Sequence, residues 1–138
     1  MSYLLDTNIV SAILRKNERV NARYKATLRR GRRVFMSGIT YYEVKRGLLH
    51  SNATRKLADF EDLCDTIAIL PVLSELSILE KASEIYADLK RRGRPIQDAD
   101  ILIAATAIAN NLTLVSNDTD MQRVTEVTIE NWVESRSS

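Results

Sequence analysis

The feature that most constrains the fold is a short apolar segment near the N-terminus, residues 3–5, which stops on Asp6, Thr7 and Asn8. An apolar run of this length ended by polar residues is typical of a buried parallel strand. In open α/β sheets the carboxyl ends of such strands form the edge where ligands bind. Asp6 is therefore a candidate functional carboxylate. Asp is equally typical of a helix N-cap, and this segment alone does not separate the two roles.

The rest of the chain alternates segments of strand length with amphipathic segments of helix length. This alternation predicts an α/β fold with a central parallel sheet of four or five strands and helices on both faces. We expect a single domain over residues 1–134 and a frayed polar tail at 135–138. The further strands are expected at residues 34–36, 67–70, 112–115 and 127–129, and the helices at residues 9–14, 20–30, 40–49, 53–64, 76–92 and 101–109.

Several acids follow the ends of the expected strands. Right-handed crossovers bring the ends of the first, second and fourth strands to one edge of the sheet, carrying Asp6 and the segments 37–43 and 116–118. Glu43 also has a structural alternative, because Thr40 and Glu43 have the spacing of a capping box. The positions of the other acids must therefore show whether Asp6 and Glu43 belong to a functional site or only cap helices.

Carboxylates that converge on one place repel each other and lose solvation, and a cation relieves both costs. Asp98 and Asp100 open the helix that leads to the fourth strand, although Asp98 is also a candidate N-cap there. His50 is the only histidine and Cys64 the only cysteine, so a zinc site and an internal disulfide are not expected. A set of carboxylate oxygens favours a hard ion, Mg²⁺ or Mn²⁺.

Basic residues are concentrated in two places. Residues 15–33 contain nine Lys or Arg against the single acid Glu18, and residues 90–94 form a second cluster. Such runs are often solvated helix faces, but here we favour a surface for a polyanion. An acidic pocket within a basic surface suits a nuclease, because the Lys and Arg side chains hold the nucleic-acid backbone and the carboxylates hold the metal. The expected backbone contacts are Arg29, Arg30, Arg32, Arg33, Arg91, Arg92 and Arg94.

Composition excludes several classes of protein. The chain of 138 residues is 45% hydrophobic and 28% charged, as in an ordinary globular domain with its own core. The longest uncharged run, residues 101–117, is interrupted by Asn110 and Asn111, and the N-terminus lacks the features of a signal peptide. We therefore expect a cytoplasmic protein without a membrane span.

Four motifs taken together resemble those of the PIN-domain ribonucleases. Each is weak alone, but the four occur in order and span nearly the whole chain. The chain length and the closing Glu130-Asn131-Trp132 look most like the VapC toxins of VapBC toxin–antitoxin pairs. The motifs are Leu4-Leu5-Asp6-Thr7-Asn8, Ile39-Thr40-Tyr41-Tyr42-Glu43 with Arg46-Gly47, Asp100-Ile101-Leu102-Ile103-Ala104-Ala105 and Val115-Ser116-Asn117-Asp118.

The resemblance implies an endoribonuclease that depends on Mg²⁺ or Mn²⁺, forms a homodimer and is inhibited by a small VapB-type antitoxin. No motif encodes the RNA, but structured RNAs such as tRNA are frequent targets of similar proteins. Metal ligation and catalysis are assigned by the resemblance to Asp6, Glu43, Asp100 and Asp118, with Asp98 and Asp120 as secondary candidates. The polar residues expected to line the pocket are Thr7, Asn8, Thr40 and Ser116.

Two other functions compete with this interpretation. A PIN-like domain could bind RNA or a protein without cleaving, but the full set of four acids argues against it. A phosphatase with Asp6 as nucleophile would want a second acid two residues later, where Asn8 stands.

The antitoxin is expected to place an Arg among the acids, because a guanidinium pairs bidentately with carboxylates. The rest of its segment would lie in an apolar groove beside the second and third helices. The residues expected to flank that groove are Tyr24, Leu28, Leu48 and Leu57.

Overall fold

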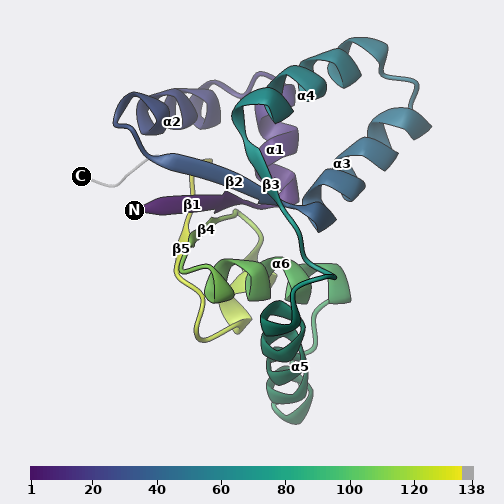
Figure 1. The fold of residues 1–138 in the computed structure, drawn as a ribbon, viewed down its shortest axis with the longest axis vertical. Helices are drawn as coiled ribbons and strands as arrows, with labels where there is room; N and C mark the ends of the chain where they lie inside the picture. The colour runs from purple at the N-terminus through teal and green to yellow at the C-terminus, as the bar shows by residue number, and fades with distance from the viewer. Residues whose placement is uncertain (135–138) are drawn as a thin grey trace.

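The computed structural model describes residues 1–134, so the predicted tail at 135–138 lies outside the described residues. Strands and helices alternate along most of the chain (Figure 1). In chain order the elements are β1 (Ser2–Leu5), α1 (Thr7–Leu14), α2 (Glu18–Arg29), β2 (Arg33–Ser37), α3 (Gly38–His50), α4 (Thr54–Thr66), β3 (Ala68–Leu70), α5 (Leu76–Arg91), α6 (Asp98–Ala109), β4 (Thr113–Val115), the 3₁₀ helix η1 (Thr119–Arg123) and β5 (Ile129–Glu130).

The strands form one parallel sheet in the order β3-β2-β1-β4-β5, which confirms the predicted α/β fold. The chain builds outward from β1 through β2 to β3, and then crosses to the other side of β1 for β4 and β5. The order therefore reverses between β1 and β4, and such a switch point leaves a crevice at the carboxyl ends of the two strands. There the Asp6 N–H donates a hydrogen bond to the Val115 carbonyl at 2.9 Å.

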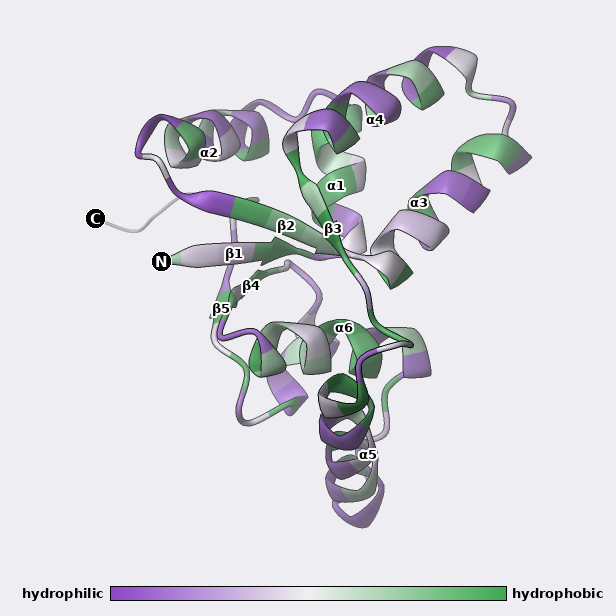
Figure 2. Ribbon diagram, viewed as in Figure 1, coloured by the Kyte–Doolittle hydropathy of each residue, from purple (hydrophilic) through white to green (hydrophobic). Residues whose placement is uncertain are grey.

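Helices cover both faces of the sheet. In Figure 1, α1 to α4 lie on one side of the strands, and α5 and α6 lie on the other. Because successive strand residues point to opposite faces, Leu4 packs in the core beneath α5 and α6, and Leu5 packs in the core beneath α1, α2 and α4. Figure 2 shows hydrophobic colour along β2 and much of α6, while α2 and α5 carry long hydrophilic stretches.

The segment after β5 is anchored by Trp132, which is fully buried. Its ring lies 5.7 Å from the ring of Tyr3, and its Nε1 donates to Glu130 Oε1 at 2.9 Å. The Arg23 guanidinium pairs with the same Glu130 oxygen at 2.6 Å. These contacts connect the last strand to β1 and α2, so a strand of two residues is held in place.

The start of α3 differs from the expectation. The N-cap is Ser37, whose Oγ accepts from the Thr40 N–H at 3.1 Å. The predicted capping box at Thr40 and Glu43 is therefore wrong, because β2 passes directly into α3 at Ser37 and Gly38. Glu43 has no role at this helix end.

Two other boundaries depart from the sequence pattern. Strand β5 occupies Ile129–Glu130 rather than residues 127–129, and η1 was not expected because it carries no apolar periodicity. Across residues 1–134, no helix combines the length and the apolar character needed to cross a membrane.

Candidate metal centre

Asp6 lies at the switch point of the sheet and has both of the roles considered for it. As the N-cap of α1, it accepts a hydrogen bond on Oδ1 from the Thr7 N–H at 2.7 Å. Its Oδ2 accepts from Ser116 Oγ, just after β4, at 2.7 Å. The side chain is only 4% exposed, so both oxygens have fixed positions between β1 and β4.

Glu43 reaches the same region from α3. Its Oε1 accepts from Thr7 Oγ1 at 2.7 Å, and Thr7 Oγ1 lies 3.1 Å from Thr40 Oγ1. Its Oε2 lies 3.7 Å from the Arg46 guanidinium. Thr7 therefore connects the end of β1 to Glu43 of α3. Thr40, which is expected among the pocket residues, lies on α3 with Glu43 and contacts Thr7.

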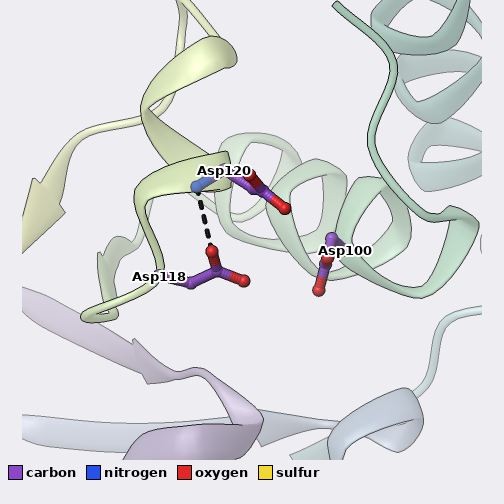
Figure 3. A group of neighbouring side chains, drawn as sticks. All are labelled: Asp100, Asp118 and Asp120. Carbon is purple, nitrogen blue, oxygen red and sulfur yellow. Dashed lines mark hydrogen bonds between the residues drawn. The ribbon is translucent and has the colours of Figure 1, made fainter.

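Asp100, Asp118 and Asp120 form a compact group in which one carboxylate oxygen of each lies within 4.8 Å of the others (Figure 3). Asp100 comes from the first turn of α6, and the other two come from the loop and η1 after β4. Asp118 Oδ1 accepts from the Asp120 N–H at 2.9 Å, and the Asp118 N–H donates to Ser116 Oγ at 3.0 Å. Ser116 thus orients both Asp118 and Asp6.

The two secondary candidates separate in the structure. Asp120 belongs to the compact group, although it also pairs with Arg123 at 3.3 Å. Asp98 is exposed and lies outside that group. It is the first residue of α6 rather than its N-cap, which is Gln97.

The pKa of Asp100 depends both on its burial and on the other acids. Burial, followed by the charges of Asp6, Asp118, Glu43 and Asp120, raises the pKa of Asp100 to about 6. Burial also raises the pKa of Asp6, against the hydrogen bonds from Ser116 and Thr7 that lower it. A carboxylate that is disfavoured by its neighbours is stabilised by a cation among them.

The available donors fit a hard divalent cation. The compact group offers only carboxylate oxygens, and Asn8 Oδ1 is a further buried oxygen without a hydrogen-bond partner among residues 1–134. Asn8 also donates from Nδ2 to Asn117. His50 is at the far end of α3 and Cys64 is in α4, so neither belongs to the acidic group. Mg²⁺ and Mn²⁺ prefer such oxygen ligands.

The two basic clusters lie on different elements, and the first of them is far from the acids. Arg33 pairs with Ser2 at the start of β1, about 13 Å along the strand from Asp6. Arg29, Arg30 and Arg32 adjoin this far edge, at the end of α2 and in the following turn. In the second cluster, Arg92 pairs with Asp88 at 2.7 Å and donates to the Arg123 carbonyl at 2.7 Å, and the Arg123 side chain in turn pairs with Asp120. Arg123 therefore lies between this cluster and the acids.

Arg46 belongs to the second of the four motifs, but the sequence alone predicts no role for it. It is the only Lys or Arg among residues 1–134 within 4.0 Å of a carboxylate oxygen of Asp6, Glu43, Asp100 or Asp118. Its spacing of three residues from Glu43 on a helix is the pattern that would have identified it.

Comparison with known proteins places this arrangement in a family. The sequence profile of the PIN domain matches residues 3–127. Ribonuclease VapC1 of Haemophilus influenzae strain R2866 is 28% identical over 134 residues, which cover 96% of this chain and 98% of that protein. The tRNA(fMet)-specific endonuclease VapC of Shigella flexneri is 30% identical over 134 residues, with the same coverage of the two chains.

A solved structure agrees with these relatives. A chain in the structure of VapBC-1 from nontypeable Haemophilus influenzae superposes with a TM-score of 0.84 and 29% identity. The match covers 97% of this chain and all of that chain. The similarity therefore extends over the whole fold, including the strand ends that carry the acids.

Proposed function

This chain belongs to the PIN-domain family and, within it, to the VapC ribonucleases, and we propose that it is a toxin endoribonuclease whose hydrolysis of RNA depends on a divalent metal ion. The proposed ligands, direct or through water, are Asp6, Glu43, Asp100 and Asp118, with Asp120 as a further candidate. The observation that carries this proposal is the group of carboxylates beside the switch point, where burial and then the charges of the neighbouring acids raise the pKa of Asp100. Mg²⁺ is the proposed ion, with Mn²⁺ as its substitute.

When bound, such an ion lowers the pKa of a water molecule and neutralises charge on the reacting phosphate. Neighbouring side chains of the chain would hold the carboxylate oxygens that such an ion requires. Thr7 fixes one oxygen of Glu43, and Ser116 fixes one oxygen of Asp6. Hydrogen bonds of this kind set the orientation of ligands and their affinity for metal.

We propose a folded RNA, with tRNA as the first candidate, as the substrate. A relative from Shigella flexneri carries the name of a tRNA(fMet)-specific endonuclease. The cluster at residues 91–94 is linked to Asp120 through Arg123, and we propose that it holds the RNA backbone on this side of the acids. Arg33 is about 13 Å from Asp6 along β1, and we propose that Arg33 and the adjoining Arg29, Arg30 and Arg32 contact a more distant part of the same RNA.

The proposed partner is a VapB-type antitoxin, since similar chains are found in VapBC complexes. Its Arg would compete with the metal for the acids. The structure offers a groove of about 230 Å³ beside Glu43, between α1, α3 and α4. Its apolar part is formed by Leu14, Val44 and Leu48, whereas Tyr24, one of the residues expected to flank a groove, is buried in the core. A homodimer and a cytoplasmic location remain proposals of the same kind.

The deciding experiment combines calorimetry with a cleavage assay. Wild-type protein should bind Mn²⁺ and cleave bulk tRNA, and EDTA should abolish cleavage. Asp6→Asn should lose both activities while retaining its circular dichroism spectrum, whereas the exposed control Asp98→Asn should retain both. Unchanged Mn²⁺ binding in Asp6→Asn would refute the proposed ligand set. Metal binding without cleavage of any RNA would instead favour a non-catalytic binding domain.

A further inference from the structure

Arg46 is placed to contact whatever binds at the acids, although it is not one of their structural supports. The ion pair between its guanidinium and Glu43 Oε2 is long, at 3.7 Å, and the Arg46 side chain is 58% exposed. Exposed pairs of this length contribute little to stability. The guanidinium is therefore free to exchange Glu43 for a stronger partner.

Glu43 itself does not depend on Arg46 for its position. Its other oxygen, Oε1, is held by Thr7 Oγ1 at 2.7 Å. The oxygen left for an added ligand is therefore Oε2, the one that Arg46 now faces. A divalent cation and the Arg46 guanidinium would compete for this oxygen, because two positive charges repel when they share one carboxylate.

Tyr42 supports the guanidinium on its other side. The Arg46 Cζ lies 4.9 Å from the centre of the Tyr42 ring, one helical turn earlier on α3. Tyr42 is 59% exposed, which is unusual for a large aromatic side chain and leaves one turn of α3 with an open stacking surface. Stacking fixes the plane of a guanidinium and leaves its N–H groups free to donate to two oxygens of a phosphate.

We propose that Arg46, supported by Tyr42, binds an RNA backbone phosphate beside the acidic group. This inference rests on the ribonuclease activity proposed above and adds a substrate contact to it. In the absence of RNA, the guanidinium stays beside Glu43 Oε2. If Glu43 Oε2 held a metal ion, the Arg46 guanidinium would lose this partner and could donate to the phosphate instead. Arg46 therefore opposes metal binding but favours RNA binding.

The test uses the opposite effects of Arg46 on metal binding and on RNA binding. In calorimetry without RNA, Arg46→Gln should bind Mn²⁺ about two- to fivefold more tightly than wild type, since a competing charge of an exposed pair has been removed. Fluorescence anisotropy of labelled bulk tRNA, with Ca²⁺ in place of Mg²⁺, should show about ten- to a hundredfold weaker RNA binding by the same variant. The salt dependence of binding should also fall by about 0.7 in slope, as for one lost phosphate contact.

Two further variants separate charge from geometry. Arg46→Lys keeps the charge but loses the planar fork, so its RNA affinity should be intermediate. Tyr42→Ala should weaken RNA binding in the same direction and by less, whereas Tyr42→Phe should stay near wild type because the ring is retained. Arg55→Gln is the matched control, because it removes one exposed positive charge from α4, away from the acids.

Weaker Mn²⁺ binding by Arg46→Gln would overturn the proposal, because it would mean that Arg46 positions Glu43. Equal loss of RNA binding in Arg55→Gln would also overturn it, since the effect would then be one of net charge. Failure of the proposed function is a different result: wild-type protein would bind Mn²⁺ and leave every RNA intact.

Discussion

Replacing Asp100 by Asn should stabilise the metal-free protein at neutral pH, although the substitution removes a residue of the proposed site. The pKa of Asp100 is raised from 3.8 to about 6 in the folded protein, first by burial and then by neighbouring acids. A carboxyl with a raised pKa binds its proton more tightly in the folded state. Its contribution to stability is therefore complete below about pH 4 and is lost as the pH rises through about 6.

The size of the effect follows from that difference in pKa. The interval from 3.8 to about 6 corresponds to about 3 kcal/mol, at about 1.4 kcal/mol for each pKa unit. Asp100 is only half-buried, so water screens part of the repulsion. We therefore expect Asp100→Asn to raise the free energy of unfolding by about 1–2 kcal/mol at about pH 7, and by nearly nothing at about pH 4.

Urea unfolding in EDTA at the two pH values measures this gain, and Asp98→Asn is the matched control. Both substitutions remove an acid from the first turn of α6 and so lose the same favourable interaction with the helix dipole. Only Asp100 belongs to the compact acidic group. The difference between the two variants therefore measures the combined cost of burying Asp100 and of its repulsion by the other acids.

Mn²⁺ should reverse the ranking of wild type and Asp100→Asn. A ligand that binds only the folded state stabilises it by about 2.7 kcal/mol at a hundredfold excess over its Kd. Wild type should gain this stability and Asp100→Asn should gain much less. If Asp100→Asn is instead destabilised at neutral pH without metal, or if its gain is the same at both pH values, the unfavourable burial and repulsion of the Asp100 carboxylate are absent.

Three further substitutions test the supports of the site and the core. Thr7→Val removes the hydroxyl that holds Glu43, so Mn²⁺ affinity measured by calorimetry should fall about tenfold without a change in helix content. Ser116→Ala removes a hydrogen bond that lowers the pKa of Asp6, so half-maximal Mn²⁺ binding should require a higher pH. Trp132→Ala leaves a large cavity in a fully buried place and should cost about 3–5 kcal/mol in urea unfolding.

Much of the fold was predictable because it is encoded locally. The short apolar runs that end on polar residues indicated parallel strands, and the helical spacing between them indicated crossovers. The reversal of strand order between β1 and β4 was not predictable, because no local pattern states which strands become neighbours. The start of α3 was misplaced for a related reason: Ser37 and Gly38 look like a turn, but Ser37 caps the helix.

The site was predictable only in part. Asp6 and Asp118 follow strand ends, so their approach to one edge followed from the topology expected of a parallel sheet. Asp120 joins Asp100 and Asp118 through the 3₁₀ turn of η1, which has no periodic pattern to identify it. The roles of these acids in catalysis remain predictions.

Charge counts along the chain proved least informative about position. Arg29 to Arg33 are strongly basic, yet they lie at the edge of the sheet opposite to Asp6. A count of charges does not tell where in the fold they lie, whereas the register of β1 and β2 does. Only the pairing of β1 and β2 shows that Arg33 lies at the opposite end of the strand from Asp6.

The double position of Asp6, as cap of α1 and as member of the acidic group, has a genetic consequence. Asn caps helices about as well as Asp does, so an Asn in this place keeps the helix start and removes the charge. One nucleotide separates the codons of the two residues. A single nucleotide change can therefore inactivate the protein while its product still folds. Unlike a truncated chain, that product should still bind the antitoxin.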